Sequence, residues 1–212
     1  MAVYNSPMGR PRTVSDTAVL EASFRVIARL GPTQFTLADI AAESGLAPAT
    51  LIQRFGSKRG LLLTMARDAA QGADWCFAKV RAEHRSPLRA LLASFDEMAM
   101  LATSPEVLAN NLAFLQMDLA DPEFRQWALV NSRATLAGFQ ALLDDAIKAK
   151  ELRRCDTKGL ARLLQAAAHG SMIAWGFSQE GAVETWMRRD IELALAPYRL
   201  ARPRRSAARY NP

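Results

Sequence analysis

Apolar residues recur at intervals of three and four along most of this chain, which is the spacing of an amphipathic helix. Prolines, glycines and capping residues divide the pattern into about nine helical segments. They are expected near residues 16–30, 37–44, 48–55, 57–81, 88–102, 105–119, 122–147, 157–177 and 183–198. No segment alternates apolar and polar residues as a half-buried strand does. The predicted fold class is therefore all-α, with an N-terminal three-helix head and a C-terminal helical bundle.

The same spacing assigns an inner face to each helix. In the first helix, which Gly31 and Pro32 are expected to end, the inner face comprises Val19, Leu20, Ser23, Phe24, Ile27 and Leu30. In the helix near 105–119 the expected inward stripe comprises Leu108, Leu112, Leu115 and Leu119.

The stretch 35–63 predicts two short helices joined by a tight turn. Thr36 is suited to cap the first of them, and Asp39 follows three residues later, as in a capping box. Gly45 supplies the left-handed residue that ends a helix, and Pro48 is pre-set for the first position of the next. Together they predict a helix-turn-helix, whose second helix enters the major groove in DNA-binding proteins.

A third helix is expected to begin after Ser57, with Lys58 in its first turn. A cation at that end opposes the helix dipole unless an anion is bound, and helix N-termini attract phosphates. We therefore predict that Lys58 contacts a DNA phosphate. The alternative is a solvated surface lysine.

Three pieces within residues 36–62, T-L-A-D-I-A, G-L-A-P-A-T-L and F-G-S-K with a leucine pair, resemble the DNA-binding segment of the TetR family of transcriptional regulators. The segment V-L-E-A-S-F-R-V-I-A-R-L-G at 19–31 resembles the first helix of that family. The resemblance covers roughly residues 10–65. It implies a head that binds DNA and a body whose last two helices pair two copies of the chain.

The chain departs from the family pattern at three positions. Ile52 stands where the family usually has a tyrosine that contacts a phosphate, and Ala47 stands at a cap that is often Ser or Thr. Arg54 stands where His or Tyr is common, and its charge is a candidate replacement for the lost phosphate contact. None of these changes removes the helix-turn-helix.

The net charge of +6 is unevenly placed. Residues 1–60 carry seven Lys/Arg against four Asp/Glu, residues 61–198 carry fifteen against seventeen, and residues 199–212 carry five Arg and no acid. This asymmetry favours a nucleic-acid-binding head on a nearly neutral body. The basic N-terminal segment is expected to reach the minor groove or a phosphate, the alternative being a disordered solubilising tail.

These patterns divide the chain into a flexible basic arm at 1–14, a helix-turn-helix domain at 15–60, a ligand-binding and dimerisation domain at 61–199, and a disordered basic tail at 200–212. The candidate DNA-binding residues are Arg10, Arg12, Thr36, Ala38, Pro48, Ala49, Thr50, Ile52, Gln53, Arg54 and Lys58.

The resemblance implies a homodimer through residues 157–198, where small residues at 166–171 allow another helix to approach closely. The alternative is that these helices pack within one monomer. Aromatic and Met side chains on consecutive body helices are typical of apolar ligand pockets, although such residues more often form core. The candidate ligand-binding residues are Phe95, Met98, Phe114, Met117, Trp127, Phe139, His169 and Met172.

Other chemistries find little support in the sequence. The two cysteines, Cys76 and Cys155, are far apart, and the two histidines have no partners at ligand spacing, so neither a metal nor a cofactor is expected. No apolar run approaches the ~18 residues of a membrane helix. The N-terminus lacks the apolar core of a signal peptide, so a cytoplasmic location is expected.

The function predicted is a DNA-binding transcriptional regulator, namely a repressor released from a palindromic operator by a small apolar or amphipathic ligand. Two alternatives stay open. One is a DNA-binding architectural protein without a ligand. The other is an all-α enzyme or carrier, which is disfavoured because paired carboxylates, a metal set and a nucleophile with its base are missing from the sequence.

Overall fold

The computed structural model describes residues 14–200, and in that range the chain forms nine α-helices, two short 3-10 turns and no strand of a sheet. The all-α prediction is confirmed. The helices are α1 (Asp16–Gln34), α2 (Leu37–Ser44), α3 (Pro48–Phe55), α4 (Lys58–Glu83), α5 (Pro87–Ala99), α6 (Pro105–Ala120), α7 (Pro122–Lys148), α8 (Thr157–Ser178) and α9 (Val183–Leu195). The 3-10 turns are Met100–Ala102 and Ala196–Tyr198.

Most helices begin where the local sequence favours a start. In seven of the nine helices described, a Ser, Thr or Asp side chain at the N-cap accepts a hydrogen bond from an amide of the first turn. Only α3 and α9 lack such a cap, and α3 has Pro48 at its first position instead. Gly45 adopts the left-handed conformation at φ 71° and ends α2.

The first helix continues slightly beyond its predicted end. Gly31, at φ 77° and ψ 161°, breaks the regular helix, and Pro32 starts a further turn that reaches Gln34. The sequence therefore identified the break correctly but missed the short turn that follows. A kink at this Gly-Pro pair has a clear cause, since the left-handed residue interrupts the hydrogen-bond ladder and proline cannot donate to it.

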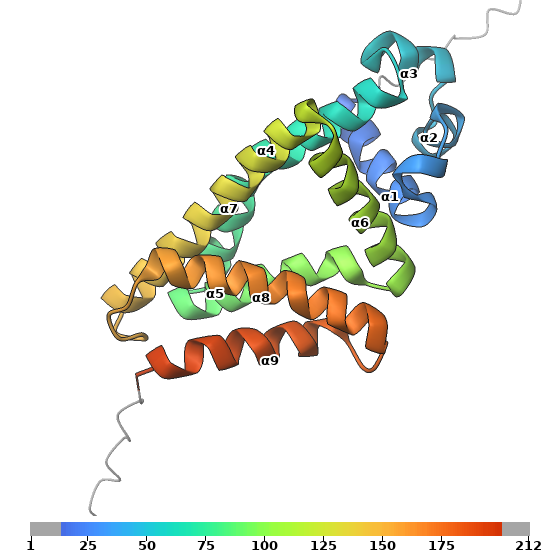
Figure 1. Ribbon diagram of the computed structural model, residues 1–212. Coiled ribbons are helices and arrows are strands. Elements are labelled where there is room, and N and C mark those ends of the chain that lie inside the picture. Colours follow the sequence, from blue (N-terminus) through green and yellow to red (C-terminus); the bar gives the residue numbers. More distant parts are fainter. Residues whose placement is uncertain (1–13, 201–212) are drawn as a thin grey trace, which may run out of the picture.

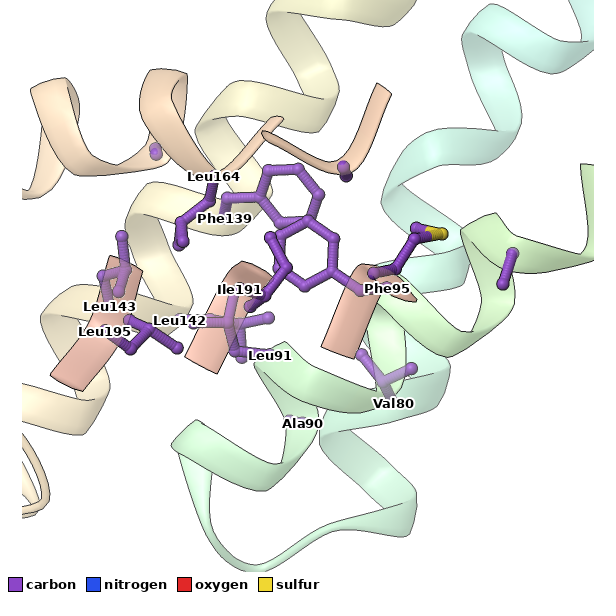
Figure 2. Packing of buried hydrophobic residues seen from close by; sticks show 14 of the residues in the cluster. Val80, Ala90, Leu91, Phe95, Phe139, Leu142, Leu143, Leu164, Ile191 and Leu195 are labelled. Carbon is purple, nitrogen blue, oxygen red and sulfur yellow. The ribbon is translucent and has the colours of Figure 1, made fainter. Parts of the chain in front are cut away.

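The helices are arranged as a head joined to a triangular body (Figure 1). In the head, α1, α2 and α3 lie beside the first turns of α4. In the body, α4 lies along α7, α8 lies along α9, and α6 connects the head with the end of α5. The body is held by one apolar cluster, in which Phe95 of α5 stacks on Phe139 of α7 with ring centroids 4.6 Å apart (Figure 2).

The predicted inward stripe of α6 is wrong. Leu108 is buried, but Leu112, Leu115 and Leu119 are exposed, Leu119 to 66%. The helix instead packs other sides against α1 and α7, which are its main neighbours in the structure. Helical spacing shows that a face is apolar, but tertiary packing decides which face is covered.

No helix in the stretch from 14 to 200 is long and apolar enough to cross a membrane. Arg10, Arg12 and the tail arginines beyond residue 200 lie outside the described residues, so their expected roles remain predictions.

Candidate nucleic-acid interface

The recognition helix α3 is oriented by one anchor. Leu51 is fully buried in the head cluster together with residues of α1 and α2. Because residues on the opposite side of a short helix must face outward, the side chains of Pro48, Ala49, Ile52 and Gln53 are exposed. Ile52 is 53% exposed, so this side of α3 also offers apolar surface. These side chains form the outward face of α3, and Thr50 lies half-buried beside it.

The start of α2 is fixed by a reciprocal cap. The Thr36 hydroxyl accepts from the amide of Asp39 at 3.3 Å, and the Asp39 carboxylate accepts from the Thr36 amide at 2.7 Å. The hydrogen bonds from the amide and hydroxyl of Thr36 lower the pKa of Asp39 below its usual value. Ala38, in the first turn, is exposed. Thr36 is thus engaged within the head, and its contact with DNA remains a prediction.

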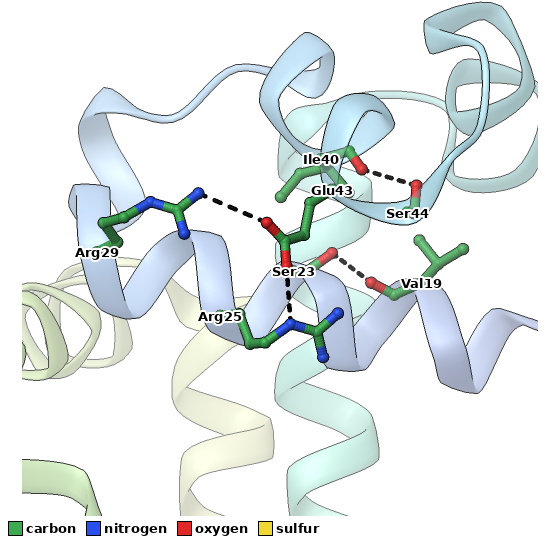
Figure 3. Close-up of polar contacts among 7 residues, drawn as sticks. All are labelled: Val19, Ser23, Arg25, Arg29, Ile40, Glu43 and Ser44. Carbon is green, nitrogen blue, oxygen red and sulfur yellow. Dashed lines mark hydrogen bonds and ion pairs between the residues drawn. The ribbon is translucent and has the colours of Figure 1, made fainter.

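Two ion pairs tie α2 to α1 (Figure 3). Glu43 accepts from Arg25 Nε at 2.8 Å and lies 3.6 Å from an Arg29 nitrogen. The hydrogen bond from Arg25 lowers the pKa of Glu43. Beneath these pairs, the buried Ser23 hydroxyl donates to the Val19 carbonyl within α1 at 2.8 Å. The ion pairs add to the apolar cluster through which α1 and α2 pack, and this packing positions the turn before α3.

Lys58, the predicted phosphate contact, has partners inside the head. Its Nζ donates to the carbonyls of Thr33 and Phe35 at 2.8 and 2.6 Å, and it lies 4.2 Å from the centre of the Phe35 ring. Partial burial lowers the pKa of this lysine. The ammonium group therefore joins the start of α4 to the last turn of α1 and to the residue that follows that helix. Its role toward DNA remains a prediction, with one of three donors free for it.

Arg54 is also engaged inside the head. One guanidinium nitrogen donates to the Val14 carbonyl at 2.6 Å and to the Asp16 carboxylate at 3.2 Å. The contact joins the end of α3 to the beginning of α1, directly after the basic arm. Arg54 would have to exchange these partners in order to bind the phosphate expected from the sequence.

Every basic side chain in the described part of the head, residues 14–60, has an intramolecular partner. The fifth of them, Arg59 of α4, pairs with Asp121 at 2.8 Å and Glu123 at 2.5 Å at the start of α7. This head therefore presents few free cations to a phosphate backbone.

The predicted ligand residues do not gather around one cavity. Phe114 of α6 and Trp127 of α7 line a common cavity of about 160 Å³ between head and body. Phe95, Phe139 and Met172 are buried in the body cluster and belong to its packing. The remaining three do not line the cavity either. Met98 packs on the body cluster, Met117 packs on the head cluster, and His169 is on the outer side of α8.

Sequence reasoning missed the one charged residue that lines that cavity, Asp118 of α6. The available signal was that Asp118 is the one charged residue in the stretch 110–120, which reads N-N-L-A-F-L-Q-M-D-L-A. It also missed the contribution of α1, because Phe24 had been assigned to the core whereas it is half-exposed and lines the cavity. Among residues 14–200 no cluster of His, Cys, Asp and Glu is suited to hold a metal ion.

A buried anchor on a short second helix, a capped first helix and an exposed outer face define a helix-turn-helix of the DNA-binding type. A model of the family described as "Bacterial regulatory proteins, tetR family" matches residues 19–65. The HTH-type transcriptional regulator BetI of Agrobacterium fabrum is 30% identical over 155 residues, which are 71% of this chain and 70% of that protein. BetI of Burkholderia thailandensis is 27% identical over 193 residues, covering 88% and 96% of the two chains.

The fold is also shared with a solved structure. FadR from Bacillus subtilis, crystallised in complex with stearoyl-CoA, superposes with a TM-score of 0.66 at 17% identity, over 86% of this chain and 98% of that one. The chain belongs to the TetR family of bacterial transcriptional regulators. It is accordingly a DNA-binding regulator of transcription and not an enzyme. Regulators of this family bind operators and small-molecule effectors, typically as dimers.

Proposed function

We propose that this chain is a repressor that binds a palindromic operator as a homodimer and is released by a small effector. The observation that carries the proposal is the outward face of α3, where Pro48, Ala49, Ile52 and Gln53 are exposed while Leu51 anchors the helix. Gln53 can form two hydrogen bonds with an adenine edge, and small or apolar side chains can contact a thymine methyl.

The dimer is proposed to form through residues 157–198. The outer side of α8 carries exposed residues at alternating spacings of three and four, namely Leu163, Ala166, Gly170, Ile173 and Phe177. Leu193 of α9 is 63% exposed. An apolar stripe with small residues at its centre suits close packing against an identical helix. A two-fold arrangement would place two α3 helices about one turn of DNA apart, ~34–36 Å.

Effector control is proposed to act through the relative populations of two dimer arrangements. The FadR complex supports it, because that protein holds stearoyl-CoA in the same fold. An effector that binds more tightly to the dimer whose heads are wrongly spaced for DNA weakens operator binding. The coupling free energy between the two ligands is typically ~1–3 kcal/mol.

Selection of bound fragments from random DNA tests the role of α3. Wild type should return a palindromic consensus, and Gln53→Ala should relax one position in each half-site at a cost of about 1–3 kcal/mol. The control is Gln116→Ala, since that exposed glutamine lies on α6 in the body. An identical consensus from Gln53→Ala and wild type would show that Gln53 does not read a base.

A further inference from the structure

The cavity that contains Phe114 and Trp127 lies where the head meets the body. Its walls come from α1 of the head, the long α4, and α6 and α7 of the body. Its volume of about 160 Å³ is close to the ~150 Å³ in which an apolar cavity holds benzene. The site therefore suits a compact molecule and is too small for a long acyl chain.

The lining combines aromatic rings with one negative charge. Phe24, Phe114 and Trp127 contribute the rings, and Asp118 contributes a carboxylate. No lysine, arginine or histidine lines the cavity, and within residues 14–200 Asp118 has neither an ion pair nor a hydrogen bond. Burial raises the pKa of Asp118, because the charged form loses hydration without gaining a partner.

We propose that this cavity binds a small organic cation, an amine or quaternary ammonium compound, with its charge against Asp118 and its alkyl groups against the aromatic rings. Aromatic faces attract cations within about 6 Å, most strongly when water is displaced. The carboxylate then gains the counter-charge that the protein does not supply within the described residues.

Other ligand classes fit this lining less well. A neutral apolar ligand would displace water from Asp118 and leave a desolvated charge without a partner, which is unfavourable. An anion would face the carboxylate with no compensating basic group. A primary or secondary amine gains one further contact, because the Asn111 amide donates to the Leu101 carbonyl at 2.6 Å and its own oxygen remains free to accept.

The position of the cavity gives the ligand a regulatory consequence, and this part rests on the proposed function. The α1 wall includes Ala28, whose carbonyl accepts a hydrogen bond from Asn110 of α6 at 2.8 Å. A molecule between α1 and α7 would therefore favour one angle between head and body. In a dimer that angle sets the distance between the two α3 helices, so the cation would change operator affinity.

Isothermal titration calorimetry of the full chain at constant ionic strength tests the binding site. The probes are tetramethylammonium chloride and tert-butanol, which is neutral and of similar size. Wild type should bind tetramethylammonium saturably and tert-butanol at least tenfold more weakly. Asp118→Asn should weaken tetramethylammonium binding at least tenfold, whereas Asp74→Asn, a change on the exposed surface of α4, should leave it unaltered. Equal affinity in wild type and Asp118→Asn, equal affinity for the two probes, or no saturable binding would overturn the proposal.

A second variant separates the rings from the charge. Trp127→Leu keeps an apolar side chain in the cavity but removes an aromatic face, so it should weaken tetramethylammonium several-fold more than it weakens tert-butanol. Equal weakening of both probes would contradict the role given to Trp127.

Fluorescence anisotropy with the selected operator then tests regulation separately. Tetramethylammonium should weaken operator binding by wild type and not by Asp118→Asn. If the chain binds the cation through Asp118 but selects no DNA, the proposed function fails and the binding site stands. If it binds its operator but no cation, the site fails and the proposed function stands.

Discussion

At the scale of single residues, Lys58 shows how one side chain can serve both the fold and DNA binding. Its ammonium donates to the carbonyls of Thr33 and Phe35 at the end of α1, so its removal leaves those acceptors and the Phe35 ring without this partner. Lys58→Met should lower the free energy of unfolding by about 1 kcal/mol, less than the ~1.5–3 kcal/mol of a buried charged hydrogen bond because the group is partly solvated. Thermal or urea unfolding measures this change.

A matched control for Lys58 exists in the body. Lys158 also lies in the first turn of a helix, α8, but is exposed, so Lys158→Met should change stability by a few tenths of a kcal/mol at most. If both variants unfold alike, the Lys58 contacts do not stabilise the head. Loss of DNA affinity in Lys58→Met with unchanged stability would instead identify this lysine as a phosphate contact.

The raised pKa of Asp118 predicts a specific dependence of stability on pH. When the folded pKa of an acid exceeds its unfolded value, ionisation favours unfolding, so the destabilisation is complete above the folded pKa and absent below the unfolded one. Asp118→Asn should therefore raise the melting temperature at neutral pH. The gain should shrink as pH falls through the folded pKa and vanish below the ordinary pKa of an aspartate. Melting curves of wild type, Asp118→Asn and Asp74→Asn across pH measure it, and a gain independent of pH would contradict the assignment.

At the scale of elements, the contact between α1 and α6 depends on a glycine. Gly31 has φ 77°, and a Cβ added there would lie 2.6 Å from the Asn110 side-chain oxygen. Gly31→Ala should destabilise the chain by about 2 kcal/mol or more through backbone strain and this overlap. Asn110→Ala should cost about 0.5–1.5 kcal/mol through the lost hydrogen bond to Ala28.

The double variant distinguishes the two causes. Truncating Asn110 removes the overlapping atoms, so Gly31→Ala combined with Asn110→Ala should cost less than the sum of the single changes. The control is Gly72→Ala in α4, where an added Cβ meets nothing within 4 Å and alanine is the better helix former. Urea unfolding of all four variants measures the coupling, and strict additivity would rule out the steric part of the account.

The elements were largely predictable because their signals are local. Ser57, Gly45 and Pro87 fix helix ends through hydrogen bonds and dihedral preferences that involve only neighbouring residues. The covered face of α6 and the lining of the cavity were not predictable, because both depend on which helices meet. Phe95 and Phe139 read as ligand residues by type, yet their mutual stacking makes them core. Asp118 acquires its meaning only beside Phe24 of α1 and Trp127 of α7, because the packing of separate helices brings these three side chains to one cavity.

At the scale of the whole molecule, head and body are joined by packed side chains rather than by a linker. Leu61 and Met65 of α4 and Phe124 of α7 belong to the apolar cluster of the head. Arg59 adds ion pairs to Asp121 and Glu123 across the same junction. A change in the body can therefore reach α3 through packed side chains, which is the kind of connection that coupling between an effector site and a DNA site requires.

The proposed dimer interface on α8 and α9 can be tested at this same scale. Phe177 is 86% exposed at the end of the apolar stripe of α8, so a partner helix is expected to cover it. Phe177→Asp would place an unpaired charge in that interface, and we expect it to weaken the dimer by about 3 kcal/mol, roughly a hundredfold in dissociation constant. Sedimentation or size-exclusion chromatography over a range of concentrations measures the change.

The matched control is Trp75→Asp, because Trp75 is a large apolar residue of α4 that is 68% exposed outside residues 157–198. It should leave the dimer intact. Since a monomer contacts only one half of a palindrome, Phe177→Asp should also reduce operator affinity while preserving the sequence preference of each half-site. Dissociation by Trp75→Asp with an intact Phe177→Asp dimer would move the interface to α4 and overturn the proposed arrangement of the two heads.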